Sequence, residues 1–384
     1  MTTGTLDSKR SSSIELLKIV AIVLIVLNHT VMTIAKVDAV NYFPDGISNT
    51  IDLRLATCRL DYLVLIVMRH FGAIGNSIFL IPSVWFLSQN SSTKTEKAVN
   101  LVIDTWLLSV LILASISLWG GVKLHYTDIV KSFLPMTFKN NWYVTAYLLL
   151  YLVHGVLNSV IEIVSKKQHF TICAMLSILY MGFGTISTSF FYYTHLMYFV
   201  TVYFVVSYIR RYASEYIQDK NIAKKILMIG FIGLLILIVA TDFVGLHLNL
   251  FRNKMWFWAK TSNPFTFLIA LGSFGLALSK DYSNKGINYI SGLSLFIYLI
   301  HENLLVRSIV RPKMWMLLTD IIQINVVCQE LIFALIVFAI SLGLAAVYNL
   351  CFRKICKIAS RVISRNIESI TDDVFEFINA RTLR

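Results

Sequence analysis

The hydrophobic positions of the chain gather into ten long apolar runs that are separated by short polar segments. A helix needs about 20 consecutive, mostly apolar residues to cross a bilayer. We therefore predict ten membrane helices, of which the eighth is short and the fifth and sixth nearly touch. The predicted spans cover residues 14–36, 62–88, 99–120, 143–164, 170–189, 191–209, 226–247, 263–279, 287–308 and 324–352.

The polar segments between these runs predict the orientation. An even number of spans puts both termini on one side of the membrane. Lys and Arg are more frequent in the segments that share a side with the N-terminus than in the others, and such an excess marks the cytoplasmic side. We therefore predict an all-α, polytopic membrane helical bundle with both termini in the cytoplasm.

The end of the chain differs from the rest, because residues 353–384 are basic with spaced apolar side chains. This pattern is typical of an amphipathic helix that lies on a membrane surface. We predict a membrane domain over residues 1–352, followed by a basic cytoplasmic tail, 353–384, on the inner leaflet.

Composition excludes a soluble protein. Hydrophobic residues make up 57% of the chain and charged residues only 14%, against roughly 45–50% and 25% in soluble domains. One water-soluble core of this size cannot bury such an excess. The net charge of +13 would suggest nucleic acid in a soluble protein, but here the cations suit loops that face anionic lipid headgroups. We expect a multi-pass protein of the cell membrane that contacts lipids and no nucleic acid.

Two ionisable residues of the first run lie on one helix face. Lys18 and His29 are eleven residues apart, which at about 100° per residue is only about 20° beyond three full turns. They are separated by about 16 Å along the axis, with Lys18 near the cytoplasmic end. Ionisable groups are costly inside a bilayer and usually face a partner or a cavity. The stripe therefore predicts a functional face with an inner cation and an outer base.

Two other runs bring polar groups to the depth of His29. Arg69 and His70 lie about 10 Å below the outer end of the second run, and His301 and Glu302 lie at a similar depth in the ninth. A carboxylate, imidazoles and a guanidinium at one level predict a buried reaction or transport site. Spacing leaves open whether these faces converge, and which of His70 and His301 joins His29.

Plainer interpretations remain open for these residues. A membrane histidine often serves only as an interhelical hydrogen-bonder, and Glu302 can form a structural salt bridge with Arg69 or Arg307. Lys94 and Lys97, before the third run, are either ordinary inner-leaflet cations or a phosphate site. A proton-coupled transporter is the main rival of an enzyme, and a sensor or scaffold is a third class. The runs show no Gly- or Pro-broken helices in corresponding halves, which disfavours the transporter.

Five segments along the chain form a further pattern. They are Glu15-Leu16-Leu17-Lys18 followed by His29, then Gly75 to Ile81, Asn141 to Tyr147 leading to Tyr151-Leu152, Tyr203 to Arg210, and Phe296 to Asn303 with Arg307. In this order, and together with ten spans, they resemble the acyltransferase-3 family of integral-membrane acyltransferases.

The resemblance implies transfer of an acyl group, commonly acetyl, from cytoplasmic acyl-CoA to a hydroxyl of a cell-surface polysaccharide or of its lipid-linked precursor, in the bacterial plasma membrane. His29 matches the family's essential histidine, and Lys18 stands where relatives usually carry Arg. Lys94 and Lys97 most nearly match a pair of arginines, so the resemblance implies contact with the donor phosphates. We expect acetyl-CoA or another acyl-CoA as a substrate, and no bound cofactor or metal.

The residues also suit this chemistry by themselves. A sugar hydroxyl is a poor nucleophile and needs a base that titrates near neutral pH, which an imidazole supplies. His29 is the candidate base, or alternatively carries the acyl group itself. His301 and Glu302 are the other catalytic candidates, with Glu302 orienting an imidazole or stabilising its charged form. Arg69 and Trp142 join the lysines as candidates for binding the donor or the acceptor.

Overall fold

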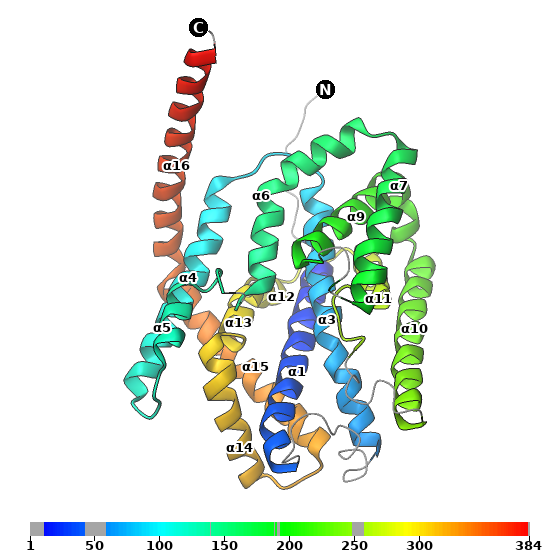
Figure 1. Ribbon diagram of the computed structural model, residues 1–384, viewed down its shortest axis with the longest axis vertical. Coiled ribbons are helices and arrows are strands. Elements are labelled where there is room, and N and C mark those ends of the chain that lie inside the picture. The colour runs from blue at the N-terminus through cyan, green and yellow to red at the C-terminus, as the bar shows by residue number, and fades with distance from the viewer. Residues whose placement is uncertain are drawn as a thin grey trace.

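The computed structural model describes residues 11–42, 59–138, 140–187, 189, 193–247 and 257–382, and every regular element within these ranges is a helix (Figure 1). The predicted all-α fold is therefore confirmed. The helices are α1 (Ser12–Tyr42), α3 (Arg59–Leu87), α4 (Thr95–Trp119), α5 (Tyr126–Phe133), α6 (Trp142–Ile163), α7 (Lys166–Leu176), η2 (Ser177–Phe183), α8 (Gly184–Ile186), α9 (His195–Gln218), α10 (Lys220–His247), α11 (Pro264–Leu278), α12 (Lys285–Gly292), α13 (Ser294–His301), η4 (Val306–Val310), α14 (Arg311–Ile321), α15 (Val326–Cys351) and α16 (Arg353–Thr382).

Seven helical segments of the described chain are long and apolar enough to cross a membrane, and they coincide with seven of the predicted runs. They are Ser12–Ile34, Leu63–Leu87, Thr95–Trp119, Trp142–Ile163, Lys166–Ile186, Lys220–Val244 and Val326–Cys351. A bent pair of helices near the C-terminal end makes an eighth if it is counted as one span. The polytopic bundle is confirmed, whereas the number ten and the cytoplasmic termini stay predictions.

The two remaining predicted spans are α9 and α11. With 15 residues, α11 is shorter than the roughly 20 residues that a bilayer requires. α9 lies inside the bundle, where it contacts α3, α6 and α7. Six of its side chains are completely buried: Tyr198, Phe199, Thr201, Val202, Tyr203 and Val206.

α1 and α3 pack side by side (Figure 1), and two glycines of α3 allow their close approach. A Cβ added at Gly75 would lie 2.6 Å from the backbone oxygen of Ala21 and 2.7 Å from Cγ1 of Ile25. A Cβ at Gly72 would lie 2.5 Å from Nδ2 of Asn28. Without side chains at these positions, α3 rests directly against the face of α1 that leads to the predicted site.

The ninth predicted span is not the single helix that we expected over residues 287–308. The helical segments Lys285–His301 and Val306–Ile321 are bent by 63° at a short break. Inside the break, the side chain of Asn303 accepts a hydrogen bond from the backbone N–H of Leu305 at 2.9 Å. This bond satisfies a donor at the start of the second segment, in the manner of a helix cap.

The C-terminal tail forms one long helix, α16, which lies beside α4 and projects beyond it (Figure 1). Arg353, at its start, pairs with Asp104 of α4 at 2.7 Å, and Arg361 lies 3.7 Å from Glu96. The helix agrees with the prediction, and its contact with the inner leaflet stays a prediction. The apolar side chains that suggested this contact are exposed: Ile358, Val362, Ile363 and Ile367.

Candidate active site

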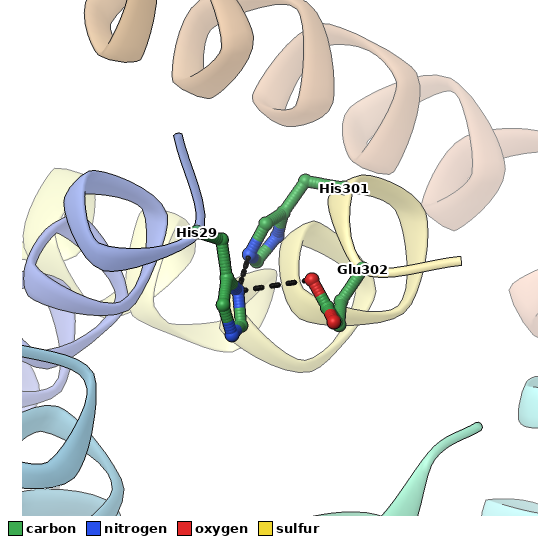
Figure 2. Close-up of side chains that lie close together, drawn as sticks. All are labelled: His29, His301 and Glu302. Carbon is green, nitrogen blue, oxygen red and sulfur yellow. Dashed lines mark hydrogen bonds and ion pairs between the residues drawn. The ribbon is translucent and has the colours of Figure 1, made fainter. Parts of the chain in front are cut away.

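His29, His301 and Glu302 come together where α1 passes the end of α13 (Figure 2). Nδ1 of His29 lies 3.0 Å from Nε2 of His301 and 3.1 Å from Oε2 of Glu302. His301 is the last residue of α13 and Glu302 follows it in the break. The polar faces of the first and ninth predicted spans therefore converge, and His301 is the histidine that joins His29.

The hydrogen-bond partners indicate which ring nitrogen of His29 carries the proton. Nδ1 of His301 lies 2.6 Å from the carbonyl oxygen of Ile297; a carbonyl only accepts, so this nitrogen is protonated and Nε2 of the neutral ring offers a lone pair. Both partners of His29 Nδ1, that lone pair and the Glu302 carboxylate, are acceptors. His29 therefore carries its proton on Nδ1, and Nε2, which points away from both partners in Figure 2, keeps the lone pair that a base needs.

The three groups differ in burial. The side chain of His29 is 14% exposed and that of Glu302 10%, whereas His301 is completely buried. An imidazole whose Nδ1–H is held by a carboxylate and whose Nε2 keeps its lone pair is the arrangement that general-base catalysis uses.

Glu302 is held by two guanidinium groups as well as by His29. Nη1 of Arg307 lies 3.1 Å from Oε1, and Nη2 of Arg311 lies 3.3 Å from Oε2. These pairs place two positive charges beside the carboxylate and fix its plane. Glu302 therefore forms a salt bridge and also contacts His29. The salt-bridge partners are Arg307 and Arg311.

The neighbours of His29 along α1 are tied to two other helices. Arg69 of α3 donates a hydrogen bond to Oδ1 of Asn28, and Thr30 donates to the carboxylate of Glu330 in α15. Glu330 is completely buried and lies within electrostatic reach of Arg311. Since α3 holds Asn28 and α15 holds Thr30, the part of α1 that carries His29 is fixed in position against both helices.

Two imidazoles and a carboxylate whose ligand atoms lie within 4.8 Å of one another also have the composition of a metal site. Two features disfavour this interpretation. The three groups already hydrogen-bond to one another at 3.0 and 3.1 Å, and two guanidinium groups neutralise the carboxylate. We interpret the cluster as an acid–base group, and the expectation of no bound metal stays a prediction.

Three other predicted site residues lie in separate surroundings. Lys18 pairs with Glu15, one turn earlier in α1, at 3.1 Å. Nδ1 of His70 lies 2.8 Å from a backbone carbonyl oxygen one turn earlier in α3. Trp142, the first residue of α6, lies against His195 with ring centroids 4.0 Å apart. These contacts give each residue a local partner, and their roles in binding stay predictions.

Lys94 and Lys97 border a cavity of about 540 Å³ where α4 begins, which we call the lysine cavity. Tyr151 of α6 closes one side and hydrogen-bonds to the backbone of Lys94. Arg353 of α16 also lines the cavity, next to its partner Asp104. Because Asp104 balances the charge of Arg353, the two lysines give the cavity a net positive charge, which suits an anionic ligand.

A second cavity of about 200 Å³, the apolar chamber, adjoins the lysine cavity. Its lining includes Ile25, Phe79 and Tyr298. Ile25 lies one turn before His29 on α1, and the ring of Tyr298 lies 6.0 Å from that of His301. The two cavities share four lining residues: Ser83, Leu101, Tyr147 and Leu295. Together they extend from the lysines to within one helical turn of the histidine pair.

Sequence reasoning missed four charged residues of these sites: Asp104, Arg311, Glu330 and Arg353. Asp104 and Glu330 both lie inside predicted spans, 99–120 and 324–352. An ionisable residue within an apolar run is a signal of function or of a buried partner. The rule that selected His29 would therefore have selected these two carboxylates as well.

The fold and the site define a polytopic membrane protein with a buried histidine–carboxylate pair. The acyltransferase-3 family model, which describes an acyltransferase domain, matches residues 11–350. Neither a search of curated proteins nor a search of solved structures gives a match. Because the family match covers nearly the whole chain, the protein belongs to the acyltransferase-3 family, as the five segments predicted, and it is a membrane acyltransferase by family.

Proposed function

We propose that the protein is an O-acyltransferase of the bacterial plasma membrane. It moves an acyl group, most simply acetyl, from cytoplasmic acyl-CoA to a hydroxyl of a cell-surface polysaccharide or of its lipid-linked precursor. The observation that carries the proposal is the orientation of His29, whose Nδ1–H is held by Glu302 while Nε2 is left with a lone pair. Family membership supplies the reaction class.

In the proposed reaction, Nε2 of His29 removes the proton of the acceptor hydroxyl while the hydroxyl oxygen attacks the thioester carbonyl carbon. Arg69 is the candidate cation for the negatively charged oxygen of the tetrahedral intermediate. The carbon–sulfur bond then breaks, and the leaving CoA thiolate takes up the proton that His29 holds. Glu302 stabilises the imidazolium between the two steps.

The two adjoining cavities support entry of the donor from the side of Lys94 and Lys97. The phosphates of CoA are anionic, and the lysine cavity carries cations. The pantetheine arm is mostly uncharged, which suits the apolar chamber. In this arrangement the nucleotide stays at the lysines while the thioester approaches His29.

The test uses purified protein in liposomes with radiolabelled acetyl-CoA and a polysaccharide acceptor. We expect labelled glycan from the wild type and none from His29→Ala or His29→Gln, because Gln does not accept a proton at neutral pH. The matched control His125→Ala changes an exposed histidine at the start of α5 and should retain activity. Wild-type product formation by both His29 variants would refute the assignment of the base.

The same experiment separates two alternatives. Label that stays on the protein when the acceptor is omitted, and that is absent from His29→Ala, identifies an acyl-histidine intermediate in place of direct transfer. Uptake of intact substrate without any labelled glycan identifies a transporter and would overturn the proposed function.

A further inference from the structure

A third cavity, of about 390 Å³, lies between α3, α6 and α9 and belongs to neither the histidine pair nor the proposed path of the donor. We call it the arginine cavity, because Arg210 and Arg211 of α9 line it. Asn158 separates it from the lysine cavity by donating hydrogen bonds to the backbone oxygens of Leu87 and Asn90. Its other lining residues are Ser88, Gln89, Ile161, Glu162 and Ser207.

The two guanidinium groups are fixed at the cavity. Nη1 of Arg210 donates to Oγ of Ser88 at 3.3 Å. In the amide orientation that satisfies both groups, the oxygen of Gln89 accepts from Nε and Nη2 of Arg210 at 3.1 and 2.7 Å. Nη1 of Arg211 donates to the carbonyl oxygen of Ile161 at 3.0 Å. Since a guanidinium has five N–H groups, these bonds position both arginines and still leave donors for a ligand.

Ser207 provides an independent sign that a ligand is expected. The residue is only 4% exposed and lines the cavity, yet its hydroxyl has no hydrogen-bond partner in the described part of the chain. Buried hydroxyl groups are nearly always hydrogen-bonded, so an unpaired one marks a place where a partner is missing. A ligand oxygen would pair with this hydroxyl once rotation about the Cα–Cβ bond turns it toward the cavity that the residue lines.

We propose that the arginine cavity binds a phosphate group. Two adjacent guanidinium forks and a hydroxyl donor match the several acceptor oxygens of a phosphate, to which Arg binds in a bidentate manner. Two sources carry this chemistry: the headgroup of an anionic phospholipid, and the 3′-phosphate of CoA. The CoA source rests on the proposed function, and it requires the 3′-phosphate to reach across Asn158 while the diphosphate of CoA stays in the lysine cavity. The lipid source is plausible on geometry because the outer face of α6 beside the cavity exposes Val156 and Ile163.

The test measures binding by the full-length protein and requires no acyl transfer, so its failure is distinguishable from failure of the proposed function. In one arm, adenosine 3′,5′-bisphosphate is titrated calorimetrically into protein in phosphatidylcholine nanodiscs. In the other arm, retention of phosphatidylglycerol from mixed nanodiscs is measured by native mass spectrometry. The arm in which the wild type binds identifies the source of the phosphate.

Two variants locate the site. Arg211→Gln should weaken binding about 10-fold or more, since a hydrogen bond to a charged group contributes about 1.5–3 kcal/mol. Ser207→Ala removes a hydroxyl that has no hydrogen-bond partner among the described residues, so it should fold normally and weaken binding about 2- to 10-fold. The matched control Lys224→Gln with Lys225→Gln removes exposed cations from the start of α10 and should bind as the wild type does.

The proposal is supported when Arg211→Gln and Ser207→Ala both weaken binding of the probe that the wild type binds, and the control variant does not. It is overturned when the wild type binds neither probe. It is also overturned when both variants bind like the wild type while Lys94→Ala with Lys97→Ala abolishes binding, because the phosphate then lies in the lysine cavity. If Arg211→Gln fails to fold, Ser207→Ala alone decides.

Discussion

At the scale of single residues, the pairing of Glu302 with His29 predicts that this carboxylate takes part in catalysis and does not only bridge two arginines. Replacing Glu302 by Gln keeps the shape of the side chain but removes the negative charge that stabilises an imidazolium at His29. We expect kcat to fall by about 10²- to 10⁴-fold, with the KM for acyl-CoA nearly unchanged. Steady-state kinetics on purified Glu302→Gln protein measure both constants.

The control for this substitution is Glu368→Gln, which removes an exposed carboxylate of α16 and should leave kcat unchanged. A wild-type kcat in Glu302→Gln would mean that the carboxylate only bridges Arg307 and Arg311. His29 would then act without a charged partner.

Residue by residue, the sequence predicted the cluster because ionisable groups inside apolar runs are rare and costly. His29, His301 and Glu302 were selected by that rule together with helical periodicity. The sequence did not predict the tautomer of His29. The tautomer depends on the hydrogen bond between His301 and the carbonyl of Ile297, and on the contact between Nδ1 of His29 and Nε2 of His301. The role of Arg311 was also hidden, because it follows the predicted span and reaches back across a bend that the sequence did not reveal.

At the scale of helices, the break after α13 positions Glu302, and Asn303 holds the break in place through its bond to the N–H of Leu305. Replacing Asn303 by Ala removes this cap, which costs about 1 kcal/mol. We expect a lower melting temperature and a reduced kcat, because Glu302 is the preceding residue. Asn303→Ser restores a side-chain acceptor and should recover most of both.

A second cap serves as the control for this prediction. Asn325 caps α15 in the same way, by accepting from the N–H of Val327 at 2.9 Å, but it lies at an exposed end. Asn325→Ala also removes a hydrogen bond from Nδ2 to Asp61 at 2.6 Å, so it should lower the melting temperature by at least as much and leave kcat unchanged. Equal kinetic losses in both Ala variants would show that the effect is general destabilisation.

Apolar runs predicted the helices because a helix in lipid needs an apolar surface along its whole length. The break in the ninth span escaped this reasoning because neither Gly nor Pro occupies positions 302–305. The chain leaves the helix there at Asn303, whose side chain caps the next helical segment. Asparagine is common in loops as well as at helix starts, so its presence did not mark a break. The short length of α11 was visible in the sequence.

The start of α4 gives a further prediction at this scale. Lys94 and Lys97 are exposed around the lysine cavity, where CoA phosphates would lie. Changing both to Ala should raise the KM for acyl-CoA about 10-fold and leave the KM for the acceptor nearly unchanged. Changing both to Arg should retain or improve donor binding through bidentate contacts. An unchanged donor KM in the double Ala variant would assign these lysines to lipid headgroups.

At the scale of the whole molecule, the two adjoining cavities suggest that the acyl group travels inside the helical bundle. Lys18 lies about 16 Å from His29 along α1, which is similar to the reach of the extended pantetheine arm. A donor held from the cytoplasm could therefore present its thioester to His29 while the CoA nucleotide stays outside the bundle. The acceptor would then meet His29 from the opposite side of the membrane.

Sealed inside-out vesicles with the acceptor in the lumen test this sidedness. Acyl-CoA added outside should give acylated glycan in the lumen. Ile25→Trp should stop the reaction, because Ile25 is 2% exposed and lines the apolar chamber, where an indole would fill the space that the pantetheine arm needs. The matched control Val20→Trp adds the same ring at another position of α1, where Val20 is 44% exposed. This variant should keep its activity. If product forms only when donor and acceptor share the cytoplasmic side, the route through the bundle is wrong, and the enzyme acts on a lipid-linked precursor before that precursor is flipped outward.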